Sequence, residues 1–119
     1  VYRRALEYQK PLRAFVVTGE NGAPELPDRQ SFLSLNPSNL VLSSLYREGE
    51  KLVARFYEQC GTQCEAEIAL PFPIKKAVET DFNGKPVAGK RKCVKINRNK
   101  VALPVKAWEI VTLEITKAD

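Results

Sequence analysis

Alternation of apolar and polar side chains with a period of two constrains the fold of this chain more than any other feature. In residues 51–57, "KLVARFY", Leu52, Ala54 and Phe56 share one face. In residues 64–70, "CEAEIAL", the even-numbered side chains are again the apolar ones. Successive side chains of a β-strand point to opposite faces, whereas a helix repeats about every 3.6 residues. Both segments are therefore predicted to be half-buried strands.

Similar patterns recur along the chain, with turn signals between them and no helical periodicity over ten residues. Strands at this spacing are typical of an antiparallel sandwich. We predict an all-β fold, an antiparallel β-sandwich (immunoglobulin-like or related) of about 8 strands. Residues 1–119 form a single domain in this interpretation, with residues 19–30 as a flexible Pro/Gly-rich loop. The other strand candidates are residues 12–18, 32–35, 40–46, 74–82, 92–97, 100–105 and 108–116.

The segment "CGTQC" places Cys60 and Cys64 on either side of a Gly-containing tripeptide. Apolar positions are even-numbered in both flanking strands. A hairpin with Phe56 opposite Ile68 therefore keeps all of them on one side. We predict such a hairpin, with residues 61–63 as its loop and the two thiols facing each other across its mouth. A disulfide and half of a zinc site are the alternatives.

The cysteine count bears on both alternatives and on the compartment. The chain has 3 Cys, so Cys93 is the one further thiol for a metal and not every cysteine can pair within the chain. There is no Asn-x-Ser/Thr site, no apolar signal region and no apolar run long enough to span a membrane. We expect a cytoplasmic protein without a membrane partner. The start at Val1 and the count of 0 Met indicate a processed chain or a piece of a longer one.

Histidine is absent, with 0 residues in the chain. Without it there is no Ser-His-Asp or Cys-His pair and no His-bearing zinc site. Carboxylate pairs could in principle serve a glycosidase. The candidates are Glu79 with Asp81 and Glu65 with Glu67, each spaced i, i+2, or about 6–7 Å, on one strand face. Such spacing is more typical of a solvent-facing edge, so no catalytic or metal-binding residue is assigned.

A basic stretch between Phe82 and Ala107 contains no Asp or Glu. It suits a polyanion, an acidic neighbouring domain, or plain solvated surface. Nucleic acid is not favoured, because no aromatic residues are interleaved with the charges. The basic residues are Lys85, Lys90, Arg91, Lys92, Lys95, Arg98, Lys100 and Lys106.

Aromatic residues offer a third kind of candidate site, because rings can stack on sugars. The chain has 1 Trp, Trp108, at the start of a predicted strand. We expect Trp108 to pack in the core or between domains. The tyrosines that could add to a sugar-binding surface are Tyr2, Tyr8, Tyr46 and Tyr57.

The order of several short segments resembles the C-terminal β-domain of glycoside hydrolase family 38 α-mannosidases. The pieces are "SFL", "LVLSSLY", "RFYE", a strand ending in "ETD" and the closing "EIVTLEI", with "EYQKPL" resembling the lead-in strand. Cys60 and Cys64 depart from the family pattern, and residues 83–100 are longer and more basic than that pattern.

The resemblance implies a retaining glycosidase whose divalent metal, usually zinc, is held by Asp and His in a separate catalytic domain, together with an Asp nucleophile. None of these residues maps onto this sequence. We therefore expect a non-catalytic C-terminal β-domain that binds no cofactor itself and packs on the catalytic domain. Carbohydrate would be bound through the parent protein. The expected contact to the acidic cleft is Lys90, Arg91 or Lys92. The alternative is a freestanding module that binds carbohydrate or a polyanion.

Overall fold

The computed structural model describes residues 2–16, 27, 29–87 and 94–119 of the chain. These residues form one helix and eight strands, which confirms the predicted all-β class. The elements are α1 (Tyr2–Gln9), β1 (Ser34–Asn36), β2 (Leu40–Glu48), β3 (Lys51–Glu58), β4 (Cys64–Ala69), β5 (Ile74–Thr80), β6 (Lys95–Asn97), β7 (Lys100–Val105) and β8 (Ile110–Lys117).

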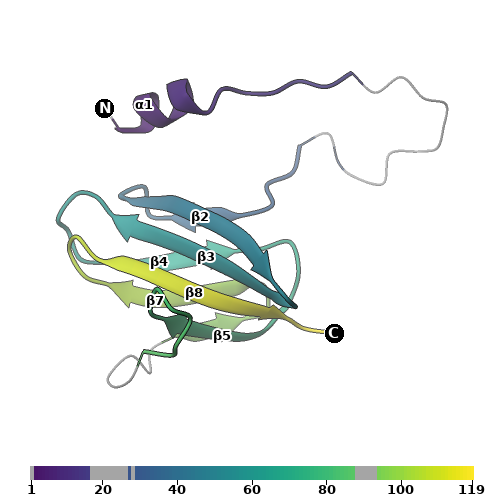
Figure 1. Cartoon of the computed structure of the whole chain (residues 1–119), viewed down its shortest axis with the longest axis vertical. Helices are drawn as coiled ribbons and strands as arrows, with labels where there is room; N and C mark the ends of the chain where they lie inside the picture. The colour runs from purple at the N-terminus through teal and green to yellow at the C-terminus, as the bar shows by residue number, and fades with distance from the viewer. Residues whose placement is uncertain (1, 17–26, 28, 88–93) are drawn as a thin grey trace.

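The strands form two four-stranded sheets packed face to face, as Figure 1 shows. One sheet has the order β1-β4-β7-β6 and the other β2-β3-β8-β5. Every pair of neighbouring strands is antiparallel. The molecule is therefore the predicted antiparallel β-sandwich.

The core lies between the two sheets and is built from the apolar positions of the alternating pattern. Phe56 and Leu113 come from one sheet, and Ile68 and Leu103 from the other, and each is at most 1% exposed. Burying a side chain of this size contributes about 1.5–3 kcal/mol. The two-residue periodicity of the sequence thus determines which face of each strand is buried.

The predicted hairpin between residues 51–57 and 64–70 is wrong, because β3 and β4 belong to different sheets. Phe56 lies opposite Leu42 on one side and Val111 on the other. Ile68 lies in the facing sheet, opposite Leu35 and Val101. In a sandwich both inner faces are apolar, so matching alternation is satisfied across the core as well as along a hairpin. Residues 59–63 therefore cross from one sheet to the other.

The beginning of the chain also differs from expectation. Residues 7–12 do not form a lead-in strand, because α1 occupies Tyr2–Gln9, a segment rich in the helix formers Arg, Ala, Leu, Glu and Gln. Residues 12–16 are not a strand either. They lie away from both sheets (Figure 1), so no neighbouring strand can take their backbone hydrogen bonds. Residues 17 and 18, and most of the loop predicted at 19–30, lie outside the described residues.

Candidate functional site

A buried carboxylate joins three loops at one end of the sandwich. Glu58, the last residue of β3, is 1% exposed. Its Oε1 accepts hydrogen bonds from the Cys60 N–H at 2.7 Å and the Asn39 side-chain amide at 2.9 Å. Its Oε2 accepts from the N–H groups of Gly61 at 2.7 Å and Trp108 at 3.0 Å. The carboxylate thus connects the β1–β2 loop, the β3–β4 crossover and the β7–β8 turn.

The hydrogen bonds keep Glu58 ionised despite its burial. Burial alone raises the pKa of this carboxyl, but the donors on Trp108, Cys60 and Asn39 outweigh that effect and lower its pKa from 4.5 to about 2. A carboxylate that accepts several N–H bonds is stabilised in its charged form. Sequence reasoning missed this residue, although its even number at the end of an inward-facing series was a detectable signal.

The same network fixes Trp108 in an uncommon conformation. The backbone of Trp108 has φ 62°, in the left-handed region that costs an ordinary residue about 1–2 kcal/mol. Its indole lies against Gly61, where an added Cβ would be 2.7 Å from the ring. Trp108 is 68% exposed, so packing in the core, one of its two expected roles, is wrong, whereas packing between domains stays a prediction. The left-handed turn before β8 directs it outward.

Trp108 forms an exposed surface with its neighbours, here named the Trp108 surface, which consists of Tyr57, Gln59, Trp108 and Ile110. Ile110 is 55% exposed. These residues line an open hollow of about 540 Å³. The Oε1 atom of Gln59 is buried without a hydrogen-bond partner in the part of the chain that the structure describes. The surface is thus largely apolar, with one unsatisfied acceptor.

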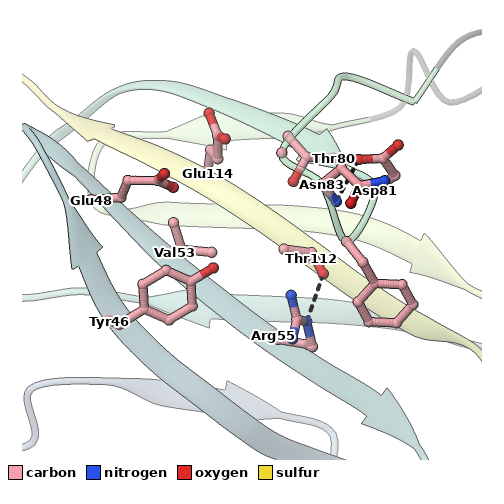
Figure 2. Close-up of a pocket in the computed structure, with 11 residues that line it drawn as sticks. Tyr46, Glu48, Val53, Arg55, Thr80, Asp81, Asn83, Thr112 and Glu114 are labelled. Carbon is pink, nitrogen blue, oxygen red and sulfur yellow. Dashed lines mark hydrogen bonds between the residues drawn. The ribbon is translucent and has the colours of Figure 1, made fainter.

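A second hollow lies on the outer face of the β2-β3-β8-β5 sheet, and we name it the outer-face pocket. Its volume is about 160 Å³. Figure 2 shows Tyr46 and Glu48 at one side, Asp81 and Asn83 at the other, and Arg55 below. Side chains on three strands form the floor, and the turn after β5 forms the far wall. The pocket is chiefly polar.

Arg55 is held at the floor of this pocket by two contacts. Its Nε donates to the Thr112 hydroxyl at 3.1 Å, and Figure 2 draws this bond as a dashed line between the two side chains. Its guanidinium carbon lies 4.6 Å from the centre of the Phe82 ring, a cation–π distance. The register places Arg55, Thr112 and Thr80 side by side across the sheet. The remaining guanidinium N–H groups are available to the pocket.

The turn after β5 is fixed by one carboxylate oxygen. Asp81 Oδ1 accepts the backbone N–H groups of Asn83 at 2.8 Å and Lys85 at 2.9 Å. Gly84 follows with φ 76°. A Cβ added there would lie 3.5 Å from Glu114 Oε1, so the turn lies beside β8 at ordinary contact distance. In the candidate carboxylate pair of Glu79 and Asp81, one oxygen of Asp81 is therefore engaged in holding the turn.

The other predicted carboxylate pair lies on the outer face of the second sheet and is bound to basic residues. Lys95 is 3.9 Å from Glu65, and Lys100 is 2.9 Å from Glu67. Two charges of the basic stretch are therefore balanced by β4. The predicted contact residues, Lys90, Arg91 and Lys92, lie outside the described residues.

The structure places some of the cysteines and tyrosines that the sequence offered as candidate site residues. Cys60 is exposed and Cys64 half-buried, and both are free thiols, while Cys93 lies outside the described residues. Tyr8 is 90% exposed on α1, and the side chain of Tyr2 is not described.

Across the described ranges, no three His, Cys, Asp or Glu residues are grouped as a metal site. No helix there is long and apolar enough to cross a membrane.

Comparison with known proteins gives one family. A family model described as the glycosyl hydrolases family 38 C-terminal beta sandwich domain matches residues 39–113, which is more than half of the chain. The match begins at Asn39, which binds Glu58, and includes β2 to β7 and the first part of β8. No curated protein matches the chain.

Proposed function

The chain belongs to the family 38 glycosyl hydrolase C-terminal β-sandwich domains, and from this we propose that it is the non-catalytic C-terminal domain of an α-mannosidase. In this proposal the parent polypeptide hydrolyses α-mannosidic bonds in a separate catalytic domain. The present domain packs on that catalytic domain and supports it.

The Trp108 surface is the observation that carries the docking role. An exposed Trp whose backbone is strained and bound to a buried carboxylate is held in place before any partner arrives. Trp and Tyr dominate the binding energy of protein interfaces, and preorganisation lowers the entropy lost on binding. Tyr57 and Ile110 extend the apolar area beside it. The partner that fits is another domain with an apolar patch of its own.

The metal chemistry that the family resemblance implies does not fit the residues of this chain. With 0 His, the chain cannot supply the Asp and His ligands of such a site. The described carboxylates Glu65 and Glu67 are engaged by lysines, and Asp81 holds a turn. The proposal therefore assigns the zinc or other divalent metal to the parent catalytic domain and derives no step through it here.

Substitution of Trp108 by Ala tests the docking role when it is made both in the isolated chain and in the parent enzyme. Truncating an interface hot spot costs about 2 kcal/mol or more, whereas an exposed side chain costs an isolated domain little. We expect the melting temperature of the parent to fall by several degrees and that of the isolated chain to change little. Phe32→Ala is the control, because Phe32 is 63% exposed and lies outside the Trp108 surface. Equal losses in the two settings would contradict docking through this surface.

Hydrolysis is tested separately with a nitrophenyl α-mannoside. The parent should release nitrophenol in a metal-dependent reaction, and the isolated chain should release none. Activity of the isolated chain would contradict the non-catalytic assignment. Inactivity of the parent on α-mannosides would remove the mannosidase assignment and favour the alternative, a binding module.

A further inference from the structure

We propose that the outer-face pocket binds a single neutral sugar ring. This proposal stands on the lining of the pocket and does not depend on the mannosidase activity of the parent. The pocket combines a buried unpartnered hydroxyl, both donors and acceptors of hydrogen bonds, and two aromatic rings.

The buried hydroxyl belongs to Thr80, at the end of β5. Thr80 is 5% exposed and lines the pocket, yet its Oγ1 has no hydrogen-bond partner among the described residues. Its neighbour in the sheet, Thr112, does have a partner, Arg55. A buried hydroxyl without a partner destabilises the folded state. A ligand hydroxyl in the pocket would satisfy it, because a threonine hydroxyl can both donate and accept.

The lining offers donors and acceptors together. Arg55 keeps guanidinium N–H groups beyond the one given to Thr112, while Asp81 keeps the oxygen that does not hold the turn. Glu114 Oε2 accepts a hydrogen bond from the Lys51 ammonium at 2.6 Å, and Glu114 Oε1 remains as an acceptor for the pocket. Glu48 stands at the side, as Figure 2 shows. Sugar hydroxyls both donate and accept hydrogen bonds, so a mixed lining suits them.

The charges of the lining argue against other small ligands. Glu48, Asp81 and Glu114 repel an anion such as phosphate. Arg55 repels a cation at the floor of the pocket, although the carboxylates attract one at its sides, so a cation is included in the test below. A neutral polyhydroxylated ring avoids both penalties, and its C–H faces can pack on the Tyr46 and Phe82 rings at the sides of the pocket.

The size of the pocket restricts the ligand to one ring. Its volume is about 160 Å³. Sites for drug-sized ligands occupy about 300–1,000 Å³. A ligand with so few atoms binds weakly, with a dissociation constant on the order of 1 mM.

Amide NMR titration of the chain tests the proposal. The probes are methyl α-D-mannopyranoside, methyl β-D-glucopyranoside and, as a cation, N-acetyl-arginine amide. We expect at least one sugar to cause saturable shifts confined to Arg55, Thr112 and residues 80–84. Absence of saturable shifts with both sugars would overturn the proposal, and so would saturation by the arginine derivative alone.

Thr80→Val separates a binding role of the hydroxyl from a structural one. Valine has nearly the same shape, so the variant should weaken sugar binding about tenfold while its melting temperature stays equal or rises. Thr116→Val, on the same sheet face outside the pocket, is the matched control and should leave binding unchanged. Unchanged affinity in Thr80→Val would overturn the proposal, and so would a clear fall in its melting temperature.

Glu48→Gln provides an independent check. Glu48 is exposed, so we expect its substitution to change stability little. The loss of a charged acceptor should weaken sugar binding several-fold. If both Glu48→Gln and Thr80→Val bound the sugar with the same affinity as the original chain, the pocket would be excluded as the sugar site.

Discussion

Glu58 occupies an inward-facing position of β3, but its buried side chain is held by hydrogen bonds and not by apolar packing. Its neighbours in the alternation, Ala54 and Phe56, fill the core, but the strand ends at Glu58, where backbone N–H groups of two loops point inward. A buried charge is tolerated only when hydrogen bonds satisfy it. Here four donors surround the carboxylate.

The stability of the domain should therefore depend on acid in a defined way. Because the pKa of Glu58 is about 2 in the folded state and 4.5 ordinarily, the unfolded chain takes up this proton first as pH falls. The stabilisation from the Glu58 carboxylate is complete above a pH of 4.5. It is lost as the pH falls from 4.5 to about 2. Calorimetric melting at stepped pH should show this loss. In Glu58→Gln it should be smaller, with a lower melting temperature at neutral pH.

Glu50→Gln is the control for this measurement. The Glu50 side chain is 91% exposed in an ion pair with Arg47, so its substitution should change the acid profile little. If Glu58→Gln and the original chain lost stability equally between neutral pH and pH of about 2, the network would not have the assigned effect.

At the scale of elements, the β3–β4 crossover joins the two sheets and positions Trp108. Gly61 lies in this crossover with φ 70°, directly under the indole. Gly49, in the β2–β3 turn, has a similar φ of 58° but open space where a Cβ would stand. Substitutions at the two glycines therefore distinguish the effect of backbone strain, which both would have, from steric contact with the indole, which only Gly61 would have.

Gly61→Ala should be more damaging than Gly49→Ala. Both replacements add left-handed strain of about 1 kcal/mol, but only the first forces the indole away. With 1 Trp in the chain, fluorescence reports this ring alone. We expect a shifted emission maximum and a larger loss of melting temperature for Gly61→Ala, and an unchanged spectrum for Gly49→Ala. Identical spectra for all three proteins would contradict the assigned contact.

At the scale of the whole molecule, the 19 Lys and Arg residues outnumber the 14 Asp and Glu residues. The β4–β7–β6 region balances Lys95 and Lys100 with glutamates. The net charge of the chain is nevertheless +5. An acidic catalytic cleft would attract the excess positive charge.

Reversal of Lys90, Arg91 and Lys92 to Glu tests whether this attraction contributes to docking in the parent enzyme. The melting temperature of the parent should fall at low salt and fall less at a salt concentration of about 1 M, where the screening length shortens to about 3 Å. Reversal of Lys75 and Lys76, on the edge strand β5, is the comparison. A parent whose melting temperature does not change at low salt would mean that the basic residues are ordinary solvated surface.

The sequence alone determined most of the strands and their buried faces, because the period of two is a local property of the chain, but residues 12–16 are not the strand that it predicted. The strands beginning at Leu40, Lys51, Cys64, Ile74 and Lys100 start where the alternation predicted. The family also followed from sequence, through the order of short strand segments.

The tertiary structure alone decided which strands are neighbours and which polar groups meet. Phe56 and Ile68 have the right parity for one hairpin and for two facing sheets, and only packing of the whole chain distinguishes them. Trp108 precedes β8, and the left-handed turn there directs its side chain to solvent. Thr80 and Arg55 are 25 positions apart in the sequence. They line the same pocket because β8 pairs with both of their strands. Local periodicity carries no information on pairing between distant segments, and both candidate sites depend on that pairing.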